Sequence, residues 1–197
     1  AYEGYHALEG EESLDMLFLK KMCHMKKVKF KIFLFIYYLL ASKLPNYAFP
    51  GGIFYNKFRI YCLRQIIPIG KECRVMRNVY IGSGENISIG NHCRINENVR
   101  IDNVQIGNHV MIARDSVILG KTHVASSTDT PMEKQGNHKS VRTIIENDVW
   151  LGIRCVVLPG LKISRGCIIG AGGVLTKSTV EYSVYAGVPA KFIKKRR

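Results

Sequence analysis

Residues 89–118 read IGNHCRINENVRIDNVQIGNHVMIARDSVI, and this stretch decides the fold. An aliphatic residue returns at almost every sixth position, at Ile89, Ile95, Ile101, Ile106, Ile112 and Ile118. The same frame begins upstream at Ile69 and resumes from Ile145 to Leu175. A period of six fits neither an α-helix, which repeats every ~3.6 residues, nor a simple strand, which alternates every ~2 residues.

This period predicts a short strand and a tight corner, repeated. Three units of about 18 residues in total would make one triangular coil, and stacked coils make a parallel β-helix. Gly and Asn adopt positive φ at low cost, so we read Asn91, Asn98 and Asn108 as corner residues. The aliphatic residue should point inward, and so should a small residue at the fifth position of each unit. That position holds Cys73, Val79, Cys93, Val99, Val110, Ser116, Val149, Cys155, Cys167 and Gly173.

The cysteines gain a packing role from this frame. Four of the six occupy the small inward position, where cysteine behaves as a small hydrophobic residue, so we predict core packing ahead of disulfides or metal ligation. Free thiols of this kind fit a reducing cytoplasm.

Charge is unevenly distributed along the 197 residues, whose formal net charge is +14. Residues 1–15 carry five acidic residues and no Lys or Arg, and the composition changes abruptly near Met16. We interpret this segment as an added leader, with a native acidic tail as the alternative. The basic remainder points to an anionic partner. Nucleic acid is disfavoured, because no aromatic and basic platform or known motif accompanies the charge.

Residues 16–66 form a basic, apolar region that we expect to be helical. Its longest apolar run, residues 32–41, is shorter than the ~20 residues that a transmembrane helix needs. Lysines flank the run on both sides. Such a helix could lie on an anionic membrane surface, or it could pack on the main domain or on a partner subunit, and both interpretations stay open.

Several motifs follow the hexapeptide frame in order: NDVWLG (147–152), LPGLKI (158–163), IIGAGGVLTK (168–177) and AGVPAKFIK (186–194). Together they resemble the hexapeptide-repeat acyltransferases, nearest the galactoside, maltose, xenobiotic and polysaccharide-linked O-acetyltransferases. The segments at 128–136 and 49–66 resemble the polysaccharide-linked members more loosely. The resemblance implies an all-β, left-handed parallel β-helix over residues 67–180, with a loop at 119–144, a helical N-terminal region and a short C-terminal extension at 181–197. It also implies a homotrimer with active sites between subunits.

His123 lies in the loop that interrupts the repeat. The resemblance makes it the general base. A histidine titrates near neutral pH and can take the proton of a sugar hydroxyl as the oxygen attacks a thioester. Asn96 matches a family Asn that binds the acceptor or stabilises the oxyanion, and its alternative role is that of a corner residue.

The family match also implies the coenzyme contacts. Acetyl-CoA would be the co-substrate, with no metal required. Lys occupies 191 and 194 where relatives often carry Arg, and Ile153 replaces a small residue. Trp150 has subunit packing as its alternative, and the basic end at 195–197 is expected to be a solvated tail. The full set of contacts is Trp150, Gly152, Ile153, Gly170, Ala171, Thr176, Lys177, Lys191 and Lys194.

His92 and His109 occupy the same position in units three apart, so we expect them to stack on adjacent coils. A zinc site like that of the γ-carbonic anhydrases is disfavoured, because the HxxxxH pair of that family is missing.

The sequence therefore predicts an acetyl-CoA-dependent O-acetyltransferase. Its acceptor would be a sugar hydroxyl, in capsule or O-antigen biosynthesis, at the cytoplasmic face of the inner membrane. The alternatives are a xenobiotic (antibiotic) acetyltransferase and a non-catalytic β-helix scaffold.

Overall fold

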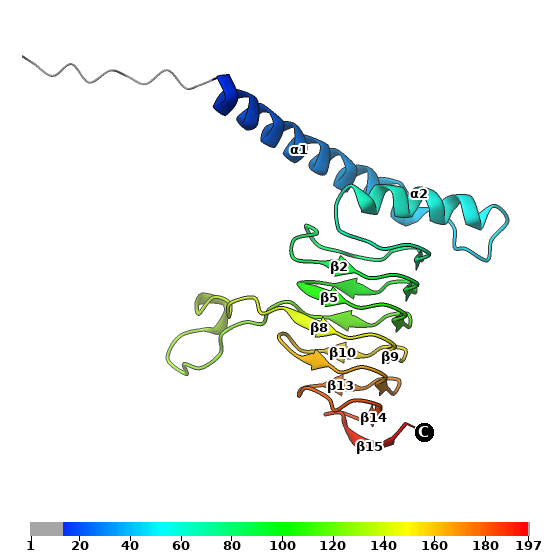
Figure 1. The fold of residues 1–197 in the computed structure, drawn as a ribbon. Helices are drawn as coiled ribbons and strands as arrows, with labels where there is room; N and C mark the ends of the chain where they lie inside the picture. The colour runs from blue at the N-terminus through cyan, green and yellow to red at the C-terminus, as the bar shows by residue number, and fades with distance from the viewer. Residues whose placement is uncertain (1–13, 197) are drawn as a thin grey trace, which may run out of the picture.

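The computed structural model describes residues 14–196 as a column of β-strand coils with helices across one end (Figure 1). The helices are α1 (Leu14–Leu39), the 3-10 helix η1 (Ala41–Lys43) and α2 (Gly52–Arg64). The predicted β-helix with a helical N-terminal region is confirmed. The expected leader at residues 1–15 lies outside the described residues, apart from the first two residues of α1.

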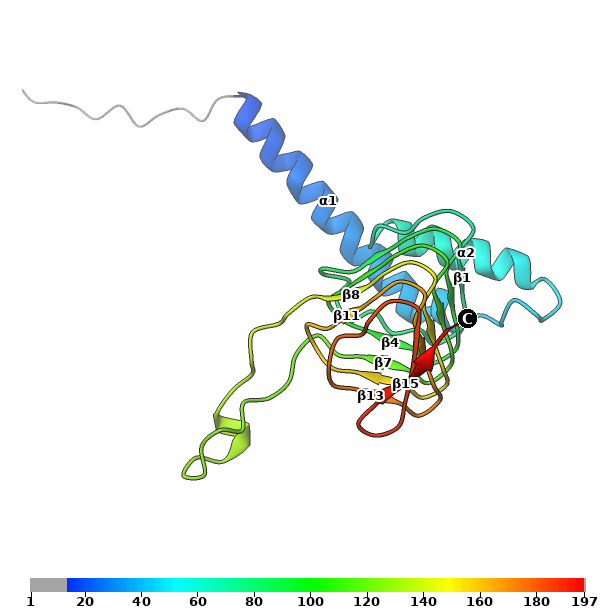
Figure 2. The ribbon, with the colours of Figure 1, turned by 60° about the horizontal axis from the view of Figure 1, so that its bottom comes forward.

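The strands form three sheets, one along each side of a triangular column (Figure 2). Sheet I contains β1 (Arg74–Val75), β3 (Arg94–Ile95), β6 (Met111–Ile112), β9 (Trp150–Leu151), β12 (Ile168–Ile169), β14 (Ser183–Ala186) and β15 (Lys191–Lys195). Sheet II contains β4 (Arg100–Ile101), β7 (Val117–Ile118), β10 (Val156–Val157) and β13 (Val174–Leu175). Sheet III contains β2 (Ser88–Ile89), β5 (Val104–Ile106), β8 (Thr143–Ile145) and β11 (Lys162–Ile163). Among these strands only β14 and β15 pair antiparallel.

Both inward positions of the repeat are buried, as predicted. The repeated aliphatic side chains from Val75 to Leu175 are at most 5% exposed, whereas Ile69 at the first coil is half-buried. Cys73, Cys93, Cys155 and Cys167 are free and buried, which confirms their packing role. The thiols also donate to the neighbouring coil, as Cys93 Sγ does to the carbonyl oxygen of Gly107 at 3.1 Å.

The corner prediction is correct for Asn98 but wrong for Asn91 and Asn108. Positive φ falls at the fourth position of a unit, where Asn98 has φ 57° and His92 also has φ 57°. Asn91 and Asn108 stand one residue earlier and use their side chains instead. The Oδ1 atom of Asn108 accepts the backbone N–H of Asn91 at 2.7 Å, so these amides join neighbouring coils.

The helices close the N-terminal end of the column. Arg59 of α2 is fully buried and donates to the carbonyl oxygens of Ala41, Leu44 and Val75 at 2.7–3.0 Å. Asn56 donates to Cys73 and accepts from the N–H of Val75, so its amide takes the place of a further strand beside β1. A free sheet edge can pair with another chain, and these contacts satisfy it.

Residues 119–142 leave the column between β7 and β8 as an arm that projects outward (Figures 1 and 2). Its root is fixed because Asn103 donates to Ser140 Oγ at 2.6 Å, and this hydroxyl donates to Gly120 O at 2.8 Å. Near the tip, which includes the 3-10 helix η2 (Met132–Lys134), the Gln135 side chain bonds the backbone of Ser127. The arm is therefore an ordered projection.

Candidate active site

His123 stands on the arm with its side chain exposed. The two sides of the arm pair as a short antiparallel ribbon, in which His138 N–H bonds Thr122 O at 2.9 Å and Val124 N–H bonds Gly136 O at 3.0 Å. His123 lies directly opposite Asn137 in this ribbon. Directly opposed residues project from the same face of an antiparallel pair, so the Asn137 amide is the nearest cross-strand neighbour of the imidazole.

An open pocket of about 550 Å³ lies at the root of the arm. The arm contributes Thr122 and His138 to its wall, and the column contributes Leu158 and Thr176. Thr176, a predicted coenzyme contact, is thus brought to the base of the arm that carries His123. Sequence analysis did not single out Asn137 or His138, because only the pairing of the two sides of the arm places them near His123.

Asn96 lies on a different edge of the column, the corner between sheets I and II. Its backbone N–H bonds Ile112 O at 3.0 Å, and the same step up the column joins Gly152 N–H to Ile169 O at 2.8 Å. Asn96 is not among the residues with positive φ, so it does not serve as a left-handed corner. This edge gathers Asn96 with Gly152, Ile153, Gly170 and Ala171.

Gly152 and Gly170 on this edge are required by the packing of the coils themselves. A Cβ on Gly152 would lie 2.7 Å from the backbone nitrogen of Ala171, and one on Gly170 would lie 3.0 Å from the Cβ of Ala186. Close packing of the coils is therefore enough to account for glycine at these two positions. The narrow edge that results is also accessible to a thin ligand.

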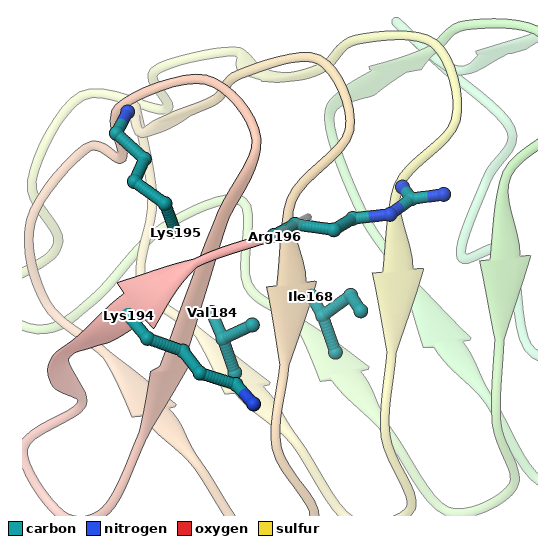
Figure 3. A pocket seen from close by; sticks show the side chains of 5 residues that line it. All are labelled: Ile168, Val184, Lys194, Lys195 and Arg196. Carbon is teal, nitrogen blue, oxygen red and sulfur yellow. The ribbon is translucent and has the colours of Figure 1, made fainter.

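Trp150 projects from the face of sheet I, 46% exposed, in register with Met111 and Ile168 on the neighbouring strands. Lys194 lies farther along this face on β15, where it borders an open pocket of about 610 Å³ (Figure 3). Lys191 is exposed on the same strand. An apolar row thus leads from Trp150 toward exposed cations at the end of the sheet.

Lys195 and Arg196 are exposed, as expected of a solvated basic end, but the side chain of each also makes a hydrogen bond to the column. Arg196 Nη1 donates to Asp148 Oδ2 at 2.9 Å, and Lys195 Nζ donates to Glu181 O at 2.9 Å. Figure 3 shows Arg196 extended beside Ile168, while Lys194 and Lys195 point in opposite directions from their strand. Arg197 lies outside the described residues.

The predicted site residues therefore form separate groups within one chain. Asn96 and the glycine edge lie at the corner between sheets I and II, whereas the His123 arm, Thr176 and the exposed Lys177 lie at the corner between sheets II and III. A single chain does not bring His123 to Asn96.

His92 and His109 stack as predicted, with ring centroids 4.7 Å apart and planes inclined by 4°. Across the described part of the chain, no group of three His, Cys, Asp or Glu side chains is arranged to hold a metal ion.

A hexapeptide β-helix that carries a histidine arm defines a class of acyltransferase, and comparison with known proteins agrees. The family "Bacterial transferase hexapeptide (six repeats)" matches residues 142–177. The chain is 33% identical to the galactoside O-acetyltransferase of Escherichia coli K12 over 76% of this chain and 72% of that protein. It is also 33% identical to an Escherichia coli K12 protein whose name provisionally assigns it O-acetyl transfer in lipopolysaccharide biosynthesis, over 73% and 82% of the two chains. The protein therefore belongs to the hexapeptide-repeat acetyltransferase family.

Solved structures agree on the fold. The maltose O-acetyltransferase of Clostridium difficile 630 superposes with a TM-score of 0.72 at 24% identity, covering 88% of this chain and 89% of that one. A galactoside acetyltransferase in complex with coenzyme A gives a TM-score of 0.58 at 25% identity, covering 88% and 82%. The left-handed parallel β-helix and the membership of the family are thus confirmed. The chain spans 62% of the length of the galactoside O-acetyltransferase of Lactococcus lactis, to which it is 31% identical over 64% of its own length.

Proposed function

We propose that this protein transfers an acetyl group from acetyl-CoA to a hydroxyl of a sugar in a surface polysaccharide, with His123 as general base. The observation that carries the proposal is the ordered arm, which holds the exposed His123 directly after Thr122, a residue that lines the open pocket at the edge of the β-helix. The coenzyme complex of the galactoside acetyltransferase supports acetyl-CoA as the donor. No metal is required in the proposed chemistry.

The chemistry is a direct transfer. His123 takes the proton of the acceptor hydroxyl while the oxygen attacks the thioester carbonyl carbon. The Asn96 amide donates to the developing oxyanion. The carbon–sulfur bond then breaks, and the proton passes from His123 to the coenzyme A sulfur. Burial raises the pKa of the Cys62 and Cys155 thiols, which disfavours at these two positions the thiolate that a covalent acetyl intermediate needs.

A homotrimer supplies what one chain lacks. His123 and Asn96 lie at different corners of the same column, so a site that uses both needs the arm of one subunit beside the I–II edge of the next. The exposed Trp150 and the glycine edge would then form one wall of the coenzyme site, with Thr176, Lys177 and the arm of the neighbouring subunit opposite. Lys191 and Lys194 are placed to meet the phosphates of the coenzyme.

The N-terminal helices favour work at an anionic membrane surface in the cytoplasm. Four apolar residues of α1 are 42–67% exposed and recur at helical spacing, namely Val28, Ile32, Phe35 and Leu39. The exposed residues Lys27, Lys29 and Lys31 accompany them, and residues 27–39 contain no acid. None of the helices that the structure describes is both long and apolar enough to cross a bilayer. An exposed apolar row with flanking lysines suits adsorption to anionic lipid, where a lipid-linked glycan would be presented.

Calorimetric titration with acetyl-CoA, followed by an acceptor screen, tests the function. We expect saturable binding of about one coenzyme per chain in the wild type and in His123→Ala. Transfer to a glycan acceptor should fall about 10²–10⁴-fold in His123→Ala. The matched control is His109→Ala, whose exposed imidazole lies outside the arm and should leave transfer unchanged. Absence of binding at millimolar acetyl-CoA would contradict the proposal, and acetylation of antibiotics in place of glycans would reassign the acceptor.

A further inference from the structure

A third open pocket lies away from the arm, between the start of α2 and the first coils of sheet I. Its volume is about 340 Å³. Lys57 of α2 and the strand residues Arg74 and Arg94 contribute three cations to its wall, beside Tyr47 and His92. This cluster, Lys57, Arg74 and Arg94, is called the cationic pocket below.

The two arginines are held side by side. Arg74 of β1 is in register with Arg94 of β3 on the adjacent parallel strand, and neighbouring strands lie about 4.8 Å apart. Like charges placed directly opposite each other across a sheet destabilise it. An anion bound between the two guanidinium groups would offset this repulsion.

None of the three cations has an ion-pair partner among the described residues. Across residues 27–196 the structure gives neither an ion pair nor a side-chain hydrogen bond to Lys57, Arg74 or Arg94. The Arg74 guanidinium instead lies 4.3 Å from the ring centroid of Tyr47. The one acidic residue in the wall, Glu72, is 3.2 Å from His92 Nδ1. The dipole of α2 adds positive potential at its nearby N-terminus. The first turn of this helix has no acid and no side-chain cap that would offset it.

We propose that the cationic pocket binds a phosphate or pyrophosphate group of the acceptor. Two arginines in register offer bidentate donors to phosphoryl oxygens, and Lys57 supplies a third charge for a multiply charged group. This proposal rests on the proposed acetyl transfer only in naming the ligand as the acceptor. The acceptor would thus be a sugar carrying a phosphoryl group, either soluble or linked to a lipid.

The position of the pocket fits this role. Arg94 stands two residues before Asn96, roughly 7 Å along an extended strand. It is two strands from Trp150 on sheet I, through β6, and so roughly 10 Å away. A phosphoryl group held here would place its sugar near Asn96, while the coenzyme phosphates would lie at the opposite end of sheet I, near Lys194.

The test uses inorganic pyrophosphate titrated into the full-length protein already saturated with coenzyme A, so that the coenzyme site is filled. We expect saturable, salt-sensitive binding that weakens at least tenfold in Arg74→Gln and in Arg94→Gln. The exposed Arg114→Gln serves as control and should bind like the wild type. Coenzyme A affinity should stay unchanged in all three variants. An unchanged affinity for coenzyme A also shows that the variants are folded. It separates a failure of pyrophosphate binding from a failure of the proposed acetyl transfer.

Two further measurements then distinguish the sources of the phosphoryl group. Retention on neutral vesicles that contain a polyprenyl pyrophosphate, reduced by Arg94→Gln, would assign it to a lipid-linked acceptor. Binding of pyrophosphate without such retention would assign it to a soluble sugar phosphate or pyrophosphate. Absence of pyrophosphate binding in the wild type, or equal binding in Arg74→Gln and Arg94→Gln, would overturn the proposal.

Discussion

The β-helix column and the N-terminal helices use apolar residues in contrasting ways. In β6 of the column, Ile112 is fully buried while its neighbour Met111 is 42% exposed, as the repeat requires. In α1, Tyr37 is fully buried while Phe35, two residues earlier, is 67% exposed, although both are large aromatic residues. The column hides its repeated apolar positions, whereas α1 has an apolar row on its exposed face as well as on its packed one. Burial in the column thus accounts for stability, whereas the exposed apolar row of α1 indicates a binding partner.

The largest expected effect separates the inside of the column from its outside. Ile112→Ala should lower the free energy of unfolding by ~2–5 kcal/mol, because it opens a cavity in a close-packed core. Met111→Ala on the same strand should cost only ~0.5 kcal/mol. Chemical unfolding at one fixed protein concentration measures both values. Equal losses for the two variants would contradict the inward and outward assignment.

The sequence alone predicted the column because each repeated position has one physical role. A period of six fixes which side chains point inward, so the buried cysteines and the stack of His92 on His109 followed without coordinates. The corner error has the same origin. Periodicity locates a corner but does not say which of two adjacent residues, Asn91 or His92, takes positive φ.

The site was harder to predict from sequence. His123 and Asn96 were chosen by resemblance, and their roles stay predictions. The resemblance implied sites between subunits, but the separate corners of His123 and Asn96 depend on which sheet each strand joins and could not be derived from the repeat. The cationic pocket was also missed, because Lys57 and Arg74 meet only when α2 closes the end of the column. The separate corners and the cationic pocket both depend on long-range packing, which leaves no local pattern in the sequence.

The second prediction concerns the junction between the two regions. Arg59→Met should lower the free energy of unfolding by ~2–3 kcal/mol, because it leaves buried carbonyl oxygens of η1 and β1 without donors. Arg64→Met, at the exposed end of α2, should change it by less than ~0.5 kcal/mol. Limited proteolysis would then cut the N-terminal region of Arg59→Met before the column. Simultaneous cleavage of both regions would show that they unfold as one unit.

The third prediction tests the exposed row of α1. Phe35→Asp should weaken binding to vesicles containing anionic lipid at least tenfold, because a buried Phe contributes ~1.5–3 kcal/mol of apolar transfer. The control Ile144→Asp changes an exposed apolar residue on sheet III and should bind like the wild type. Vesicle sedimentation measures both, with neutral vesicles beside them. If Phe35→Asp instead changed the oligomeric state and left lipid binding intact, the row would be a subunit interface.

The smallest expected effect distinguishes two adjacent lysines at the C-terminal end of the column. Lys194 borders the pocket beyond Trp150, whereas the amino group of Lys195 is already bonded to Glu181 O. Lys194→Ala should raise the KM for acetyl-CoA about two- to fivefold, since an exposed ion pair contributes ~0.2–1 kcal/mol. Lys195→Ala should leave this KM within error, and kcat should be unchanged in both. Equal KM values for acetyl-CoA in the two variants would mean that the coenzyme phosphates do not lie on this face of sheet I.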